Sequence, residues 1–388
     1  MAIIYPENVV KIAEILKKSG FKAYAVGGCM RDSLMGRIPA DWDMTTDCSP
    51  EKMLEIFENK GIRTIPTGLK HGTVTLLLDG VAYECTTFRI DGSYTDSRHP
   101  DEVLFTNDIS LDLCRRDFTV NAIAGDPMTD EIVDLYGGKE DIERKIIRAV
   151  GDAETRFTED ALRILRALRF ATVLDFEIEK NTLSAAKKLG ERLSGVSAER
   201  KSVELEKILL SKNADRGISL LLETETAKYI HPGIKAPKVS LSTLPRRFPT
   251  RLASLFEGVP SLSCMKLSGE ITKQTKLLCD SNLYRETVEY FTDIAARSRL
   301  MLSKYGDLAP AAALLRGEKT LAGEIILQSK KSPAVSISDL AISGNDLLQV
   351  GIEPRKLGEI MKKLVIAVIE NPEKNEKKTL VSLSLEMV

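Results

Sequence analysis

The chain has 388 residues, of which 43% are hydrophobic and 29% are charged, and its formal net charge at pH 7 is −1. This composition is ordinary for globular proteins, and the length allows two or three domains with cores of their own. A near-neutral charge excludes indiscriminate binding of nucleic acid over the whole surface, but it permits a local basic channel.

Cysteine and histidine usage limits the compartment and the metal chemistry. The six cysteines are scattered without a CxxC pair and only three histidines accompany them, so neither a zinc site nor a disulfide framework is indicated. The amino terminus has no basic region followed by an apolar core, and no apolar run is long enough to span a bilayer. We therefore expect a protein of the reducing cytoplasm with no membrane partner.

Short β-branched and aromatic runs alternate with helical patterns in the first 140 residues. The patterns predict, in chain order, a helix at 8–19, a strand at 21–26, a short helical stretch at 31–35, a strand at 41–46, a helix at 50–60 and strands at 73–78 and 81–89. The Asp79-Gly80 dipeptide predicts a tight turn between the last two strands. Together these elements predict a small mixed sheet with helices behind it.

A glycine pair follows the first predicted strand. Gly27 and Gly28 stand between that strand and the short helical stretch, so the backbone can approach a phosphate chain closely and offer N–H groups from a helix start. Arg31 adds a fork of donors for phosphate oxygens. A glycine pair alone is more often a turn, and its meaning depends on what stands near it.

Two carboxylates stand in the second predicted strand, in Asp41-Trp42-Asp43. Residues two apart in a strand point the same way, so Asp41 and Asp43 present adjacent anions on one face. Such anions repel each other, and the natural relief is a pair of divalent cations, usually Mg²⁺. We therefore expect a two-metal site for phosphoryl transfer, with Asp41 and Asp43 as catalytic metal ligands.

Helical periodicity dominates after residue 139, with helices expected at 159–172, 198–210 and 217–223. Thr158 is a plausible N-cap of the first, with Asp160 in its first turn. Asp160 and Arg163 are then neighbours on one helical face, and the alternative to a function for them is a surface ion pair. The prolines, lysines and serines of residues 232–249 mark an internal boundary.

An aspartate and an arginine side by side can read the edge of a base. Cytosine and adenine both offer an exocyclic amino donor beside a ring-nitrogen acceptor, whereas uracil and guanine offer a carbonyl beside an N–H donor. A fixed pair of Asp160 and Arg163 would accept cytosine and adenine and reject the other two bases.

Four motifs carry a resemblance to a known family: Gly27-Gly28-Cys29-Met30-Arg31-Asp32, Asp41-Trp42-Asp43-Met44-Thr45-Thr46, Arg115-Arg116-Asp117-Phe118-Thr119-Val120-Asn121-Ala122 and Glu159-Asp160-Ala161-Leu162-Arg163-Ile164-Leu165-Arg166. With them the chain resembles the class II tRNA nucleotidyltransferases, which are the bacterial CCA-adding enzymes and their poly(A) polymerase relatives. The resemblance is dense from about residue 20 to 210. Cys29-Met30 departs from the usual small apolar residue and valine, but it leaves Gly28 and Arg31 in place.

The resemblance implies an α+β protein with an amino-terminal nucleotidyltransferase palm, of the polymerase-β type, followed by an all-α region of neck, body and tail. We predict a catalytic head at 1–140, a helical neck with the nucleotide-selecting pocket at 141–205, and an all-helical body and tail that binds tRNA at 206–388. In the family the motif of Asp160 and Arg163 selects the base.

The resemblance also assigns nucleotide contacts to further arginines. Arg115 and Arg116 match the segment for sugar and phosphate contacts, although adjacent residues of a regular element cannot both face one ligand, and Arg115 is slightly favoured. Arg166 stays near the face of Asp160, where it could orient the pair or touch a phosphate. Arg169 lies about half a turn away and is as well explained as a structural ion-pair partner.

A third carboxylate is customary in this chemistry, to deprotonate or orient the primer hydroxyl. Glu84, on the strand at 81–89, follows the metal pair in a suitable order, and the alternative is a solvent-facing glutamate. Residues 89–100 look like the flexible loop that re-aims the base pocket between C and A in the family.

We therefore predict template-independent addition of C, C and A to the 3′ end of tRNA from CTP and ATP by two-metal nucleotidyl transfer. A poly(A) polymerase or an A-only enzyme is the alternative within this chemistry. A catalytically inactive RNA-binding protein is the alternative from another class. Nothing in the sequence decides the oligomeric state.

Overall fold

The computed structural model of the protein describes residues 3–91 and 103–388. Its contacts divide the chain into two compact units, Met1–Pro232 and Gly233–Val388. This division falls at the start of the stretch 232–249, which the composition marks as a boundary. The predicted borders at 140 and 205 both lie within the first unit, and the roles assigned to the three segments stay predictions.

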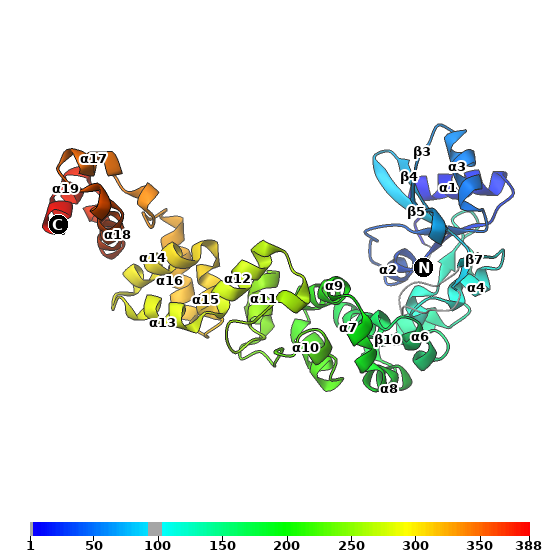
Figure 1. Ribbon diagram of the computed structural model, residues 1–388. Helices are drawn as coiled ribbons and strands as arrows, with labels where there is room; N and C mark the ends of the chain where they lie inside the picture. The colour runs from blue at the N-terminus through cyan, green and yellow to red at the C-terminus, as the bar shows by residue number, and fades with distance from the viewer. Residues whose placement is uncertain (1–2, 92–102) are drawn as a thin grey trace. The chain divides into compact units, whose positions relative to one another are not determined.

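A seven-stranded sheet forms the amino-terminal part of the first unit. Its order is β3 (Arg63–Gly68), β4 (Thr73–Leu78), β5 (Val81–Thr87), β2 (Met44–Thr46), β1 (Ala23–Val26), β8 (Ala124–Gly125) and β9 (Ile132–Val133). All neighbours pair antiparallel except β2 and β5, which are parallel. The predicted small mixed sheet is thus confirmed, and Figure 1 shows its strands in the blue and cyan part of the chain.

The predicted hairpin of β4 and β5 is confirmed by its register, in which Leu78 pairs with Val81. Asp79 and Gly80 between them both have positive φ, 50° and 77°, as the tight hairpin turn requires. Strand β3 was not predicted, because Pro66 and its polar neighbours hide a strand that lies at the sheet edge.

Two helices lie against the sheet (Figure 1), and each buries one apolar face. Helix α1 (Glu7–Lys18) buries Val9, Ile12, Ala13 and Leu16, a spacing of one helical face, and it packs against β1. Helix α3 (Pro50–Glu58) begins with the hydroxyl of Ser49 accepting from the Lys52 amide, and it packs against β3 and β4. Both helices agree with the sequence patterns within two residues.

The rest of the first unit is mainly helical. Its helices are α2 (Gly28–Leu34), α4 (Ile109–Cys114), α5 (Gly138–Glu143), α6 (Ala153–Glu159), α7 (Leu162–Leu174), α8 (Lys180–Lys188), α9 (Ala198–Leu209) and α10 (Ala214–Glu223). Two small two-stranded sheets join β6 (Arg89–Asp91) to β7 (Val103–Phe105) and β10 (Ile146–Ile147) to β11 (Glu177–Ile178). Helix α7 packs against both α9 and α10 and is largely buried.

The predicted helix start at Thr158 is wrong. Asp152 caps an earlier helix, α6, by accepting a hydrogen bond from the Thr155 amide, and Thr158 lies inside that helix. The chain leaves the helical conformation at Asp160, whose φ is −137°, and α7 begins two residues later. The uninterrupted periodicity concealed this break because both helices bury apolar residues on either side of it.

The second unit contains helices and short 3₁₀ turns in its described residues. The helices are α11 (Phe248–Ala253), α12 (Gly269–Cys279), α13 (Ser281–Glu289), α14 (Ile294–Tyr305), α15 (Ala309–Leu314), α16 (Lys319–Lys330), α17 (Gly344–Gln349), α18 (Pro354–Glu370) and α19 (Lys377–Glu386). One core forms around Met301 and Ile325, and another around Leu347 and Leu364. Across residues 3–91 and 103–388, no helix is long and apolar enough to cross a bilayer.

Candidate active site

Asp41 and Asp43 lie on the same side of the chain just before β2. Strand β2 begins only at Met44, later than predicted, but the Val26 amide still donates to the Asp43 carbonyl at 2.9 Å. Both aspartates are exposed, whereas Trp42 and Met44 are buried. The Trp42 ring packs against Tyr5 at 5.5 Å between centroids, and this contact anchors the segment that carries the two carboxylates.

Glu84 lies beside this pair because of the parallel pairing of β2 and β5. The register joins Met44 to Cys85, so one residue earlier Asp43 stands next to Glu84. Partial desolvation and then repulsion from Asp41 and Glu84 raise the pKa of Asp43 to about 6, although Arg116 opposes the shift. The solvent-facing carboxylates therefore concentrate negative charge that a cation would relieve.

The described residues contain no group of three or more His, Cys, Asp or Glu side chains placed to hold a metal ion by themselves. Asp41, Asp43 and Glu84 thus do not form a closed metal cage. A Mg²⁺ ion is usually bound by one or two carboxylates together with substrate phosphates and water, so an open pair of aspartates fits that metal.

The glycine pair forms a sharp turn from β1 into α2. Gly27 has φ 83°, a conformation that side chains rarely adopt, and a Cβ there would lie 3.2 Å from Nη1 of Arg116. Arg31 is buried under this turn, where its Nη1 donates to Asn121 at 2.7 Å and its Nη2 pairs with Asp32 at 2.8 Å. A phosphate that binds Arg31 through Nη2 would therefore have to displace the Asp32 carboxylate from it.

Arg115 and Arg116 both bind one carboxylate, that of Asp112. Arg115 donates to Oδ1 from Nε at 3.0 Å and from Nη2 at 2.7 Å, and Arg116 donates to Oδ2 from Nη2 at 3.1 Å. The two arginines meet at this carboxylate because they lie three and four positions after Asp112, just beyond the end of α4. The expectation that adjacent residues of a regular element cannot both face one ligand stays a prediction. Asp112 itself is fully buried.

Arg166, which is half-buried, and Asp117, which is buried, form a second ion pair. Arg166 donates to Oδ2 of Asp117 from Nε at 2.7 Å, while Asn121 donates to Oδ1 at 3.2 Å. Burial alone would raise the pKa of Asp117, but the attraction of Arg166 and the hydrogen bonds lower it, so Asp117 stays charged.

The ring of Phe170 gathers three of the predicted arginines. The guanidinium carbons of Arg31, Arg166 and Arg169 lie 5.3, 5.4 and 3.8 Å from its centroid. Phe170 thus provides a cation–π platform that holds positive charge together in one place. Arg169 also pairs with Glu204 of α9, which agrees with the structural explanation of Arg169.

Asp160 and Arg163 do not contact each other through their side chains, contrary to the geometry expected from one helix. Asp160 accepts from the Leu162 amide at 3.0 Å and from Nη2 of Arg200 at 2.8 Å. Arg163 pairs with Glu159 at 2.7 Å and donates to the carbonyl of Arg115 at 2.9 Å. The helix break at Asp160 is the physical reason, since it removes the helical spacing on which the expectation relied.

Sequence reasoning missed several members of this network. Asp117, Asn121 and Glu159 stood inside the quoted motifs, and the spacing of Asp112 to both arginines was a readable signal. Phe170, Arg200 and Glu204 had no local signal. The loop expected at 89–100 lies mostly outside the described residues, since Gly92, Tyr94, Asp96, Arg98, His99 and Pro100 all belong to 92–102.

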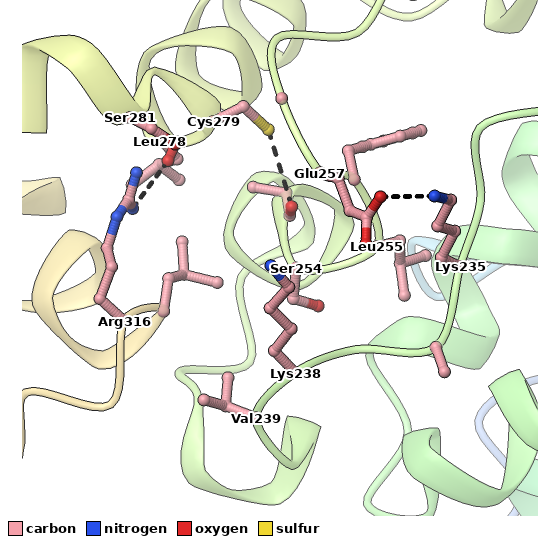
Figure 2. Close-up of a pocket in the computed structure, with 15 residues that line it drawn as sticks. Lys235, Lys238, Val239, Ser254, Leu255, Glu257, Leu278, Cys279, Ser281 and Arg316 are labelled. Atoms are coloured by element: carbon pink, nitrogen blue, oxygen red, sulfur yellow. Dashed lines mark hydrogen bonds and ion pairs between the residues drawn. The ribbon is translucent and has the colours of Figure 1, made fainter.

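The second unit has a polar pocket of about 150 Å³ between the start of that unit, the end of α11 and the end of α12. Figure 2 shows the Lys238 side chain extending toward Ser254 and the Lys235 ammonium paired with Glu257. Arg316 donates to the carbonyl of Leu278 at 2.9 Å. Three of the lining side chains, Lys235, Lys238 and Arg316, are cationic and one, Glu257, is anionic, so the lining carries a net positive charge.

Two family models match the chain. One, described as the Poly A polymerase head domain, matches residues 23–148, which include the sheet and the two arginine-bound aspartates. The other, described as a probable RNA and SrmB-binding site of polymerase A, matches residues 175–237 and thus reaches Lys235 of the pocket.

Curated relatives and solved structures agree with these matches. The chain is 34% identical over 393 residues to a CCA-adding enzyme of Levilactobacillus brevis, covering 96% of this chain and 95% of that protein. A CCA-adding enzyme of Lactobacillus delbrueckii subsp. bulgaricus is 36% identical over 381 residues, covering 95% and 94%. The crystal structure of the Bacillus stearothermophilus CCA-adding enzyme in complex with CTP is 30% identical, with a TM-score of 0.81, and covers 99% of this chain and 98% of that chain.

Proposed function

Because the chain belongs to the family of CCA-adding enzymes, we propose that it adds C, C and A to the 3′ end of tRNA from CTP and ATP. The observation that carries this proposal is the pair Asp41 and Asp43 beside the glycine turn, within the residues that match a polymerase head. Intact metal-binding carboxylates favour an enzyme over an inactive RNA-binding protein. The free thiols of all six cysteines fit a reducing cytoplasm as its place of action.

Nucleotidyltransferases of this family generally use divalent metal ions. Asp41 and Asp43 would hold two Mg²⁺ ions together with the phosphates of the nucleotide. The ions would supply neutralisation of phosphate charge and activation of the attacking hydroxyl. The 3′ oxygen of the tRNA bonds to the α-phosphorus, pyrophosphate leaves, and the hydroxyl proton passes to a carboxylate, for which Glu84 is our candidate.

The arginines of the site would bind the triphosphate and the base. Arg31, Arg116 and Arg166 each contact a carboxylate, and two oxygens of a phosphate can likewise accept from one guanidinium. For base selection, Asp160 and Arg163 stay our candidates. Each has another partner here, so reading a base would require Asp160 to release Arg200 and Arg163 to release Glu159.

We assign tRNA binding to the second unit through phosphates rather than sequence, and we propose that its polar pocket takes a backbone phosphate. Three of its lining side chains, Lys235, Lys238 and Arg316, are cationic and one, Glu257, is anionic. Single phosphate contacts are sequence-independent and position the RNA.

Incubation with tRNA transcripts that end before the tail, after C, and after CC tests the proposed activity. CTP and ATP are given separately and together. We expect C addition to the first two transcripts with CTP alone, and A addition to the third with ATP alone. Long A tails on all three transcripts would instead identify a poly(A) polymerase. Addition of A to the third transcript, with no addition of C to the first two, would identify an A-only enzyme.

The phosphate pocket is tested with Lys238→Gln and, as a matched control, Lys273→Gln, since Lys273 is also an exposed lysine of the second unit but does not line the pocket. Only Lys238→Gln should weaken tRNA binding and reduce the slope of log K against log salt, by about 0.7 to 0.9 for one phosphate. CTP binding should not change. Equal slopes in both variants and the parent would refute this contact.

A further inference from the structure

Asp112 is the most completely buried carboxylate of the site, and four residues from three segments of the chain bind it. Besides Arg115 and Arg116, the Thr45 hydroxyl donates to its Oδ2 and the Arg89 amide donates to its Oδ1, each at 3.4 Å. Thr45 lies two residues after Asp43 on strand β2. Asp112 therefore connects strand β2, which follows Asp41 and Asp43, to the two arginines.

The two arginines are not equivalent in this arrangement. Arg115 donates to Asp112 from both Nε and Nη2. Arg116 donates to Asp112 only from Nη2, and its Nε is buried without a hydrogen-bond partner among the described residues. A buried donor without an acceptor is costly unless a ligand supplies the acceptor, so the free donor of Arg116 points to a missing anionic group.

The position of Arg116 indicates which group is missing. Its Nη1 lies 3.2 Å from the place of a Cβ on Gly27, and its charge acts on Asp43. Arg116 thus stands between the glycine turn, which offers backbone N–H groups, and the aspartates that would hold metal ions. A triphosphate bound by both must pass Arg116.

The charge of Asp112 persists although the side chain is buried. Burial would raise its pKa, but the attraction of Arg116 and Arg115 outweighs burial and lowers the pKa. Asp112 therefore remains an acceptor for both guanidinium groups at neutral pH and holds their orientation without taking up a proton.

We propose that Asp112 is the positioning residue for the triphosphate of the incoming nucleotide, acting through Arg116, whereas Arg115 completes the fold around it. This inference rests on the proposed function, because it takes the nucleotide as the ligand. Asp112 does not touch the substrate. It fixes the guanidinium of Arg116 so that Nε and Nη1 face the phosphates.

A double-mutant cycle on nucleotide binding tests this proposal. CTP binding is measured by calorimetry without tRNA, so that no incorporation occurs, for Asp112→Asn, Arg116→Gln, Arg115→Gln and the two pairs with Asp112→Asn. Asp112→Asn should weaken CTP by about tenfold or more, since truncating one partner of a buried charge pair costs about this much. In the Arg116→Gln background it should add less than about twofold, whereas the Arg115→Gln background should preserve the full loss.

Pyrophosphate as a competitor of CTP separates phosphate binding from base binding, and its affinity should fall in parallel with that of CTP. Asp141→Asn is the matched control, because Asp141 is also buried and binds an arginine, Arg148, but contacts neither the glycine turn nor Arg116. It should lower stability without changing CTP affinity.

CTP and pyrophosphate affinities within about twofold of the parent in folded Asp112→Asn would overturn the proposal, as would a full additional loss in the Arg116→Gln background. If Asp112→Asn does not fold, Asp112→Glu keeps the charge, moves it by one methylene group, and carries the same two expectations. Since the cycle needs no incorporation, its outcome is independent of whether the parent adds C, C and A to tRNA.

Discussion

Buried and half-buried arginines are satisfied differently in the two units of this chain. In the first unit Arg31, Arg116, Arg166 and Arg169 pair with carboxylates. In the second unit Arg299 donates to the carbonyls of Ile369 and Glu370, and Arg316 to the carbonyl of Leu278. The carbonyl partners lie at or near the last turns of α18 and α12, where helices leave acceptors unpaired.

This difference helps to separate a ligand-binding arginine from a structural one, with Arg169 as the exception, since its pairing with Glu204 agrees with a structural role. A carboxylate and a phosphate present similar oxygen pairs to a guanidinium. An arginine held by a carboxylate can therefore exchange it for substrate or, as proposed for Arg116, keep it and offer its remaining donors. An arginine that caps helix carbonyls is fixed by the fold, and its release would leave buried acceptors unpaired. The partner of an arginine, more than its presence, therefore indicates where the substrate binds.

The largest expected effect follows from removing an anion of the first unit. Asp41→Ala or Asp43→Ala should abolish incorporation of both CTP and ATP, because the metal ions contribute several kcal/mol, equal to a thousandfold or more as an order-of-magnitude estimate. tRNA binding should remain, since these carboxylates hold cations rather than RNA. Glu51→Gln, on the exposed start of α3, is the control. More than about a tenth of the parent activity in either alanine variant would contradict two-metal catalysis.

The second largest effect should occur in the second unit and should concern stability only. Arg299→Met leaves the carbonyls of Ile369 and Glu370 without their donor, and the buried Ile369 carbonyl alone should cost about 1 to 3 kcal/mol. Urea unfolding measures the loss. Arg355→Met, at an exposed arginine that pairs with Glu353, should change stability by less than about 0.5 kcal/mol.

CTP affinity shows whether Arg299 has a purely structural role, as the comparison of the two units requires. It should be the same in Arg299→Met, in Arg355→Met and in the parent, because neither arginine holds a carboxylate of the nucleotide site. A clear fall of CTP affinity in a folded Arg299→Met protein would show that carbonyl-bound arginines also serve the substrate.

Base selection should respond next. Asp160→Asn replaces an acceptor by an amide that can donate, so the preference for CTP over UTP should fall by about 1 to 3 kcal/mol, measured as the ratio of kcat/KM values. Arg200→Gln removes the partner of Asp160 but leaves the carboxylate, and its preference should equal that of the parent. An active Asp160→Asn enzyme that selects CTP as strictly as before would exclude Asp160 from base reading.

How much of this could be predicted from sequence depends on the distance between partners along the chain. The hairpin at Asp79-Gly80, helix α1 and the shared side of Asp41 and Asp43 follow from spacings of a few residues, and these predictions agree with the structure. The break before α7 was missed because its apolar periodicity continues across Asp160.

Long-range pairs lay beyond such reasoning. Arg166 meets Asp117 at a separation of 49 residues, and Arg169 meets Glu204 at 35. A local pattern can name an arginine as a candidate, but it cannot tell whether the fold will give it a carboxylate or a helix carbonyl. That choice is made by tertiary packing, and it is the information that separates the two units here.

The smallest expected effect distinguishes the two glycines of the turn, of which sequence reasoning favoured Gly28. Gly27 has a positive φ, so Gly27→Ala strains the backbone by roughly 1 to 3 kcal/mol, and its Cβ also presses on Arg116. Gly28 is the first residue of α2, and a Cβ there meets only Nη2 of Arg31 at the ordinary distance of 3.7 Å.

Gly28→Ala should therefore keep its stability, while Gly27→Ala should lose both stability and CTP affinity. If the loss at Gly27 arises through Arg116, then Arg116→Gln should remove most of the difference in CTP affinity between Gly27→Ala and the parent, although the loss of stability persists. Urea unfolding measures the loss of stability, and calorimetry measures the loss of CTP affinity. Both are applied to the parent, Gly27→Ala, Arg116→Gln and the double variant. A Gly27→Ala enzyme that binds CTP as tightly as the parent would show that the triphosphate does not pass between the turn and Arg116. Among the carboxylate-held arginines, only Arg31 and Arg166 would then remain as candidates for phosphate binding.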